Sequence, residues 1–284
     1  MVDRDDAVRR FPPELDMSTP TVARAYDYLL GGKDNFGPDR ELGEALEQLS
    51  PGTKRLAHEN RGFLKRAVDH VVTHHGVRQF LDLGAGLPTA ENTHEIAQRA
   101  VPEARAVYVD IDPIVLAHGR AILADNPNTT VITADVREVD RVLNDADTQR
   151  LLDFSEPVCV MLVSLLHCFP DSDDPFRLVR DYLAHMPSGS AVVYSHLCSD
   201  DSEAASRFTA RVHDSGVPWG RVRAPEECAA ALAGLEIVPP DLAGTGRPQL
   251  VDCHTWRNEG VTPRLRPQDP AKTIWEHAGV GLKS

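Results

Sequence analysis

The chain of 284 residues lacks a long hydrophobic run. No apolar segment approaches the ~18 to 20 consecutive residues that a membrane-spanning helix needs. Charged residues occupy the N-terminal stretch MVDRDDAVRR, where a signal peptide carries its apolar region. We therefore expect a soluble, cytoplasmic protein without a membrane partner.

Cysteine pairs and a surplus of basic residues are also missing. The five cysteines are an odd number without C-x2-C spacing, which favours neither a disulfide framework nor a zinc site, and we expect no metal. Lysine and arginine number 30 against 43 aspartates and glutamates, a net charge of -13. Because nucleic-acid binding depends on clustered cations, this balance favours a small-molecule substrate and argues against nucleic acid as a partner.

Residues 1–78 indicate an N-terminal arm followed by helices. The arm covers residues 1–17 and is polar. Thr19 is suited to cap a helix N-terminus, and Pro20 is suited to the first helical position. The expected helices are residues 20–30, 39–49 and 53–75, the last ending at Gly76.

From residue 79 onward, short apolar segments alternate with helical segments, and we expect residues 79–284 to form the cofactor-binding domain. This alternation predicts parallel strands with helical crossovers, and strands that are apolar throughout indicate helices on both faces of the sheet. The expected strands are residues 79–83, 104–111, 129–135, 157–166 and 190–197, with 236–238 and 273–282 as further candidates. The expected helices are residues 88–100, 113–125, 136–153, 174–186, 200–214 and 224–233.

Residues at the ends of the first three strands carry the candidate chemistry, because ligands bind at the carboxyl ends of parallel strands. Gly84 and Gly86 in FLDLGAGLP allow a tight turn that a ligand can approach closely. Asp110 follows Gly86 at nearly the ~20-residue spacing of a ribose-binding acid, and Asp135 ends the third strand. Each feature alone also fits a turn or a helix cap. For Asp112 we expect the role of a helix cap. Their ordered combination favours a nucleoside cofactor.

The residues of the turn after the first strand indicate which of two cofactor classes, dinucleotides or S-adenosylmethionine, the site fits. Dinucleotide sites favour a third glycine in G-x-G-x-x-G, a position that Thr89 occupies here. Asp82 precedes the first glycine, and its carboxylate is unfavourable beside a pyrophosphate but favourable near the ammonium group of S-adenosylmethionine. S-adenosylmethionine is therefore favoured, and a nicotinamide-dependent oxidoreductase is the weaker alternative.

The motifs FLDLGAGLP, VYVDIDP and ITADV together resemble those of class I S-adenosylmethionine-dependent methyltransferases. Over residues 18–200 the chain is similar to an actinobacterial family of S-adenosyl methyltransferases, through TPTVARAYDYLLGGKDNFGPDR, RQFLDLGAGLPTAENTHEIAQ and PVCVMLVSLLHCFPD. This resemblance implies an α/β fold with a Rossmann-like sheet of seven strands, mostly parallel with the last antiparallel, and an N-terminal helical extension.

The resemblance also implies roles for individual residues. Gly84, Ala85 and Gly86 would lie against the methionine part of the cofactor, Asp110 would hold the ribose, Ile111 would flank the adenine, and Asp135 and Val136 would contact its edge. The chain departs from the general pattern at two places. Pro88 replaces a glycine, where it is suited to open the next helix, and the fourth strand lacks the terminal carboxylate of some N-methyltransferases.

Methyl transfer requires an aligned acceptor, exclusion of water and, for some acceptors, removal of a proton. His167, just after the fourth strand, is the candidate base because imidazole titrates near neutrality. A buried histidine that is hydrogen-bonded to the backbone is the alternative. Tyr28 and Asn35 are candidates in a helical lid over the acceptor, and a packing helix with a capped end is the alternative.

The sequence thus predicts a methyltransferase that acts on an oxygen or nitrogen of a small molecule. A cofactor-binding regulatory or interaction module without transferase activity stays open, because no residue is certain to act as a base. Structural roles are expected for two further groups: a solvated helix face for Arg61, Lys65 and Arg66, and core packing for Trp219, Trp256 and Trp275.

Overall fold

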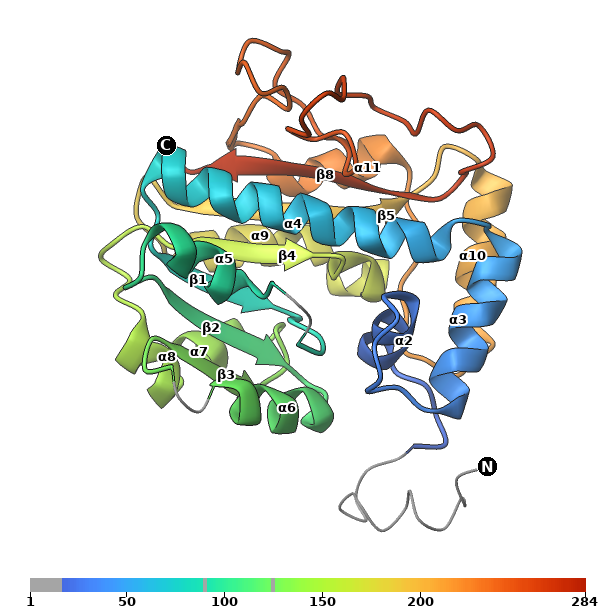
Figure 1. The fold of residues 1–284 in the computed structure, drawn as a ribbon, viewed down its shortest axis with the longest axis horizontal. Helices are drawn as coiled ribbons and strands as arrows, with labels where there is room; N and C mark the ends of the chain where they lie inside the picture. Colours follow the sequence, from blue (N-terminus) through green and yellow to red (C-terminus); the bar gives the residue numbers. More distant parts are fainter. Residues whose placement is uncertain (1–16, 89–90, 124–125) are drawn as a thin grey trace.

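The computed structural model describes residues 17–88, 91–123 and 126–284. A central sheet carries helices on both faces (Figure 1). Thr89 and all of the expected arm except its last residue lie outside the described residues.

The sheet has the order β3-β2-β1-β4-β5-β8-β6. Its strands are β1 (Gln79–Leu83), β2 (Arg105–Asp110), β3 (Thr129–Thr133), β4 (Cys159–Val163), β5 (Ala191–Cys198), β6 (Glu236–Ile237), β7 (Val251–Asp252) and β8 (Trp275–Leu282). The first five strands pair in parallel, and β8 is antiparallel to both β5 and β6. The expected mostly parallel path of seven strands with an antiparallel closing strand is confirmed. An eighth strand, β7, pairs with β8 off this path; two residues are too few to show a strand pattern in the sequence.

Helices cover the sheet in two layers. The helices are α2 (Val22–Leu29), α3 (Gly37–Leu49), α4 (Thr53–His75), α5 (Thr93–Ala100), α6 (Pro113–Leu123), α7 (Val139–Leu143), α8 (Ala146–Leu151), α9 (Pro175–Leu183), α10 (Ser202–His213) and α11 (Pro225–Ala229). Three short 3-10 turns are η1 (Leu166–Cys168), η2 (Asp171–Asp173) and η3 (Ala230–Leu232). Helices α4, α5 and α6 contribute to the core on one face, and α7, α8 and α9 to the core on the other. Residues on both sides of the central strands β1, β4 and β5 are therefore buried.

Helix α4 is part of this core, although the sequence groups it with the N-terminal helices. Its residues Phe63, Ala67, Val68 and Val71 are fully buried in the cluster that includes side chains of β1, β4, β5 and β8. The helix ends at Gly76, whose φ of 66° is the left-handed cap that a glycine accommodates best. Of the N-terminal helices among the described residues, α2 and α3 remain beyond the sheet layers.

Two expected helix starts are wrong. Helix α2 is capped by Thr21, whose Oγ1 accepts a hydrogen bond from the Arg24 backbone N–H, and the Thr19 carbonyl instead accepts from the Arg24 guanidinium at 2.6 Å. Pro88 does not open α5. That helix begins at Thr93 after Asn92, so Pro88 belongs to the turn that follows β1.

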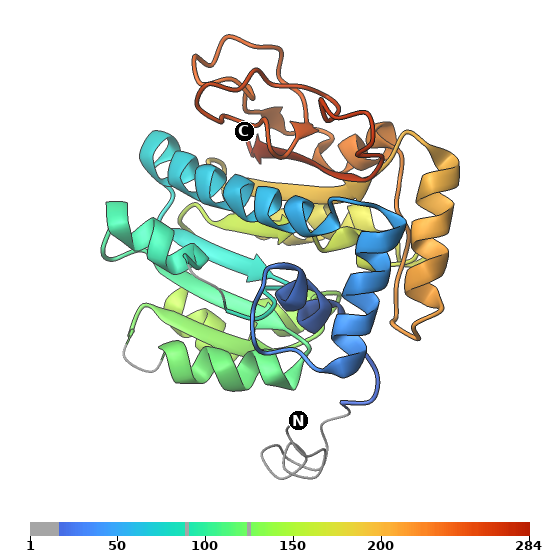
Figure 2. The same ribbon diagram turned by 45° about the vertical axis from the view of Figure 1, so that its right-hand side comes forward.

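The carboxyl ends of the parallel strands point toward α2, and this arrangement is visible from two directions (Figures 1 and 2). Helix α2 packs on α3 and α4, which hold it beside the ends of β1 and β4. The chain thus places an N-terminal helix over the edge of the sheet where the candidate cofactor residues end their strands.

Candidate cofactor and acceptor site

A cavity of about 930 Å³ lies between the strand ends and α2. Its wall includes residues 84–87, 110–113, 134–137 and 163–165 from the ends of β1 to β4, and residues 217–219 from the loop after α10. Helix α2 and the residues before it supply the opposite wall. The volume is at the upper end of the range of about 300 to 1,000 Å³ for small-molecule sites.

The turn after β1 exposes backbone to this cavity. Gly84 and Gly86 both have φ of +67°, which disfavours any side chain. A Cβ on Gly84 would also lie 2.5 Å from Leu165, whereas the space beside Gly86 is open. The expected tight turn is confirmed, and it lets a ligand contact the main chain at Gly86.

Asp110 connects the turn to the next strand end. Its Oδ2 accepts a hydrogen bond from the Gly86 backbone N–H at 2.8 Å, and its Oδ1 accepts from the Asp112 N–H at 2.9 Å. Burial raises the pKa of Asp110, and these two bonds oppose the rise. Each carboxylate oxygen retains a lone pair for a further donor, so two neighbouring hydroxyl groups of a ribose fit this group.

Asp112 has the expected role of a helix cap. Its Oδ1 accepts from the Ile114 backbone N–H at 2.9 Å in the first turn of α6. Its Oδ2 accepts from the Thr21 hydroxyl at 3.0 Å, so the same side chain joins the start of α2 to the sheet edge.

The adenine end of the predicted site has an apolar and an acidic side. Ile111 lines the cavity and is 66% exposed, which is unusual for a large aliphatic side chain, and a flat aromatic base could cover it. Val136 is buried and also lines the wall. Asp135 binds the Arg137 guanidinium at 2.6 Å, which lowers the pKa of Asp135, and Arg137 also binds Asp173. The sequence did not indicate this bridge, so an adenine amine would share the Asp135 carboxylate with Arg137.

The other end of the cavity combines a carboxylate and a guanidinium. Asp82 is buried and its Oδ2 accepts from the Thr93 hydroxyl at 2.7 Å. Burial raises the pKa of Asp82 to about 6, against the opposing effects of Thr93 and Arg61. Arg61 lines the cavity and donates to the Glu91 carbonyl at 3.0 Å, so its expected place on a solvated face is wrong. A carboxylate beside a cation is complementary to the ammonium and carboxylate groups of an amino acid.

His167 lies behind the cavity wall rather than on it. The histidine is 3% exposed, and its Nδ1 accepts a hydrogen bond from the Leu197 backbone N–H at 3.1 Å. Burial lowers its pKa to about 3. Its ring packs against Trp219, which lines the cavity in its place, with ring centroids 4.8 Å apart. His167 is thus a buried histidine that is hydrogen-bonded to the backbone, which is the alternative given in the sequence analysis. This arrangement does not favour a role for His167 as the general base.

Tyr28 and Asn35 also face away from the cavity. The Tyr28 hydroxyl contacts Glu44 and accepts from Lys54 Nζ at 3.2 Å, on the outer side of α2. Asn35 donates to Asp27 Oδ2 at 2.8 Å and to the Gly32 carbonyl, which fixes the loop after α2. Both residues therefore support the position of α2 without reaching the site.

Sequence reasoning missed several residues of the cavity wall. Tyr26 and Leu30, on the other face of α2 from Tyr28, line it together with Asn60 and Ser164. The four-residue spacing of Tyr26 and Leu30 was a usable signal for a shared face, but the sequence does not say which face turns inward. Trp219 also lines the cavity, while Trp256 and Trp275 are buried in the core.

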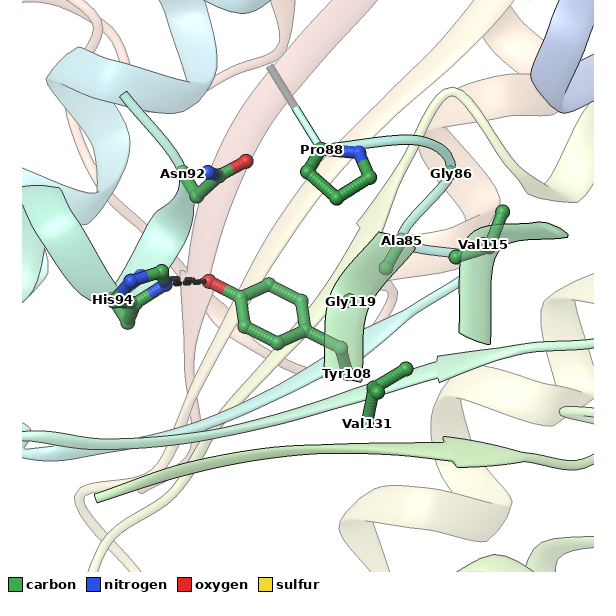
Figure 3. Close-up of a pocket in the computed structure, with 9 residues that line it drawn as sticks. All are labelled: Ala85, Gly86, Pro88, Asn92, His94, Tyr108, Val115, Gly119 and Val131. Atoms are coloured by element: carbon green, nitrogen blue, oxygen red, sulfur yellow. Dashed lines mark hydrogen bonds between the residues drawn. The ribbon is translucent and has the colours of Figure 1, made fainter. Parts of the chain in front are cut away.

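A second, smaller pocket of about 30 Å³ lies behind the β1 turn (Figure 3). There the Tyr108 hydroxyl bonds the His94 ring at 2.7 Å and accepts from the His94 backbone N–H. This volume suits a water molecule rather than a cofactor. Within residues 17–88, 91–123 and 126–284, no group of three or more His, Cys, Asp or Glu side chains is placed to hold a metal ion. No helix in the part of the chain that the structure describes has the length and apolarity to cross a bilayer.

Two solved structures are similar to this chain over nearly its whole length. The chain aligns over 96% of its length with a candidate methyltransferase from Thermobifida fusca YX, covering 98% of that chain at 41% identity and a TM-score of 0.84. A DUF574 family protein from Streptomyces avermitilis MA-4680 is 32% identical, with 95% of this chain and 99% of that chain covered and a TM-score of 0.83. No curated protein matches the chain.

The family profile described as S-adenosyl methyltransferase matches residues 9–284, nearly the whole chain. The cofactor of this family is S-adenosylmethionine. The exposed Ile111 and the Asp110 carboxylate fit its adenosyl part, and the glycine turn after β1 fits its methionine part. The chain therefore belongs to the S-adenosyl methyltransferase family and is an S-adenosylmethionine-dependent methyltransferase.

Proposed function

We propose that the enzyme transfers a methyl group to an oxygen or nitrogen of a small-molecule acceptor held in the cavity under α2. The observation that carries this proposal is that one cavity of about 930 Å³ joins the β1 turn to the β4 end and α2. A volume near the upper end of the small-molecule range gives room for an acceptor beside a cofactor.

The proposed cofactor contacts follow the walls of this cavity. Asp82 and Arg61 face the amino-acid end, residues 84–86 lie along the methionine part, and Asp110 accepts from the ribose hydroxyls. Ile111, Asp135 and Val136 surround the adenine. When bound, the cofactor supplies an already activated methyl group on its sulfonium. The protein's task is then to align the acceptor and exclude water.

Helix α2 is the proposed cover of the acceptor. We assign the lid role, expected for the helices of residues 1–78, to α2 and its following loop, because α4 belongs to the core. The lid faces the proposed acceptor position through three residues on the cavity wall, Tyr26, Asp27 and Leu30. His167, Tyr28 and Asn35 have no part in this proposal, since their hydrogen bonds and burial place them outside the wall.

Substitution of Asp110 tests the proposed site. We expect Asp110→Ala to weaken S-adenosylhomocysteine binding by about 1 to 3 kcal/mol, because ribose hydroxyls lose their acceptor. Titration calorimetry measures the affinity, and Asp140→Ala, an exposed aspartate on α7, is the matched control. An unchanged affinity in Asp110→Ala would remove this residue from the site.

The acceptor class is tested with methyl-labelled cofactor. We expect the protein to transfer label from it into a small-molecule fraction of host-cell extract, bound to oxygen or nitrogen. Label found only in protein or nucleic acid would contradict the small-molecule acceptor. Cofactor binding without transfer in any extract would favour the non-catalytic binding module.

A further inference from the structure

A buried carboxyl group lies directly behind the end of β4. Glu276, on β8, is 0% exposed, and its Oε1 accepts a hydrogen bond from the Ser164 hydroxyl at 2.6 Å. Its Oε2 has no hydrogen-bond partner among the described residues. A buried carboxylate without complete pairing is costly for a fold, so this arrangement calls for a functional explanation.

Ser164 joins this carboxyl group to the cavity. The residue lines the cavity wall and has φ of 58°, a left-handed conformation that is strained for any residue with a side chain. Its backbone N–H donates to Ser195, to Oγ at 3.0 Å and to the carbonyl at 3.1 Å. These bonds hold the strained backbone, and the hydroxyl of Ser164 is thereby placed between the cavity and Glu276.

Two neighbouring hydroxyl groups, those of Ser195 and Tyr26, do not connect the cavity to Glu276 as Ser164 does. Ser195 also lies beside Glu276, but its hydroxyl donates to Asn60 Oδ1 at 2.8 Å. Asn60 Nδ2 donates in turn to the Tyr26 hydroxyl at 3.1 Å, and that hydroxyl donates to the Ala57 carbonyl. Of these hydroxyl groups, only Ser164 both donates to the carboxyl group and touches the cavity.

Within the part of the chain that the structure describes, no cation is dedicated to Glu276. Lys272 acts on it electrostatically, yet the Lys272 ammonium pairs with Glu59 and lies 4.0 Å from Asp252. The other titratable groups that interact with Glu276 are Tyr26 on α2, Tyr194 and Cys198 on β5, Cys168 in η1 and Cys253 after β7, and burial raises the pKa of each. They are therefore neutral near pH 7. Burial raises the pKa of Glu276 to about 7, where a carboxyl group can both accept and release a proton.

We propose that Ser164 and Glu276 form a proton relay that accepts the proton of the methyl acceptor, an inference that rests on the proposed function. Ser164 Oγ receives the acceptor's O–H or N–H proton while its own proton passes to Glu276 Oε1. The acceptor atom forms a bond to the methyl carbon, the methyl–sulfur bond breaks, and its electron pair stays on sulfur. The positive charge of the sulfonium and the negative charge of Glu276 are both neutralised. The carboxylate that β4 lacks is thus provided by β8.

The relay can be tested without knowledge of the acceptor. S-adenosylhomocysteine has no charge at the reacting position, whereas the cofactor analogue sinefungin carries an amine there. An ammonium group opposite the Ser164 hydroxyl favours ionised Glu276. We expect Glu276→Gln to weaken sinefungin binding about 10-fold and to change S-adenosylhomocysteine binding less than about 2-fold.

Proton release gives a readout that a structural role would not change. Below the pKa of about 7, sinefungin binding to the wild-type protein should release a proton from Glu276. Calorimetry in two buffers of different ionisation enthalpy measures this release, which we expect to be absent in Glu276→Gln. Glu236→Gln, an exposed carboxylate on β6 that also pairs with β8, is the matched control and should behave as wild type.

Ser164→Gly removes the hydroxyl while suiting the left-handed backbone, and this relief of strain offsets part of the cost of leaving Glu276 Oε1 without its donor. We expect it to lose the preference for sinefungin as Glu276→Gln does. Equal sinefungin affinity and proton release in wild type and both variants would overturn the relay. Failure of wild-type protein to bind S-adenosylhomocysteine would instead overturn the proposed function on which the relay rests.

Discussion

At the scale of single residues, Glu276 sets a pH dependence of stability. Burial raises its pKa from 4.5 to about 7, so the folded state binds this proton more tightly than the unfolded state. The free energy of unfolding therefore falls as pH rises from about 4.5 to about 7. Glu276→Gln removes the ionisation. We expect it to stabilise the protein by up to about 3 kcal/mol above this window and to have little effect below it.

Urea denaturation at the two ends of the pH window measures this difference. The hypothesis that ionised Glu276 destabilises the folded protein is wrong if Glu276→Gln changes stability equally at both ends of the pH window. It also fails if the variant is less stable than wild type in the alkaline part of the range.

The two tyrosines of α2 provide a paired residue-scale prediction. The Tyr28 hydroxyl contacts Glu44 and Lys54 at the surface, where such contacts contribute less than about 1 kcal/mol. Tyr26 lines the cavity and its hydroxyl accepts from Asn60 Nδ2 at 3.1 Å, so loss of the hydroxyl removes this acceptor. We expect Tyr26→Phe to reduce methyl-label transfer several-fold and Tyr28→Phe to leave it unchanged. The reverse result would restore Tyr28 as the acceptor-side residue.

At the scale of elements, a buried ion pair joins α2 to α3. Asp39, in the first turn of α3, accepts from the Thr21 N–H at 3.0 Å and lies 3.3 Å from Arg24 Nε, and both charged side chains are 1% exposed. Asp39→Asn breaks this buried ion pair, and we expect the change to destabilise the protein by about 3 kcal/mol. Because α2 forms a cavity wall, we expect weaker S-adenosylhomocysteine binding as well.

Urea denaturation and calorimetry on the same Asp39→Asn preparation check both effects, with the exposed Glu41→Gln on the same helix as control. A loss of stability with unchanged affinity would show that α2 has no part in the binding site.

Elements were easier to predict from the sequence than the directions of their side chains. Strand ends such as Gly84 and Asp110 were predictable because apolar runs stop where parallel strands reach the sheet edge. The face of α2 that turns inward was not predictable, because the packing of this helix on α3 and α4 decides whether Tyr26 or Tyr28 faces the cavity. Glu276 was equally hidden, because its contact with Ser164 joins residues 112 positions apart.

At the scale of the whole molecule, the sheet and helix α2, which form opposite walls of the cavity, are held in the fold by different kinds of contact. The sheet is buried between two helical layers, whereas α2 contributes to smaller apolar clusters and is joined to the sheet edge by contacts such as Thr21 with Asp112. Local opening requires less free energy where few buried apolar contacts must be broken. A ligand in the cavity contacts both parts and therefore couples α2 to the sheet.

Hydrogen exchange with and without cofactor product measures this coupling. At about 100 times the dissociation constant, S-adenosylhomocysteine should stabilise the folded protein by about 2.7 kcal/mol. We expect slower exchange in α2 and in residues 84–87 and 110–113, because all three line the cavity. Amides of β5 and β8, two strands that pair with neighbours on both sides, should change little since they open only in global unfolding. Asp110→Ala at the same ligand concentration should lose this protection, and protection confined to residues 240–272 would place the ligand elsewhere on the molecule.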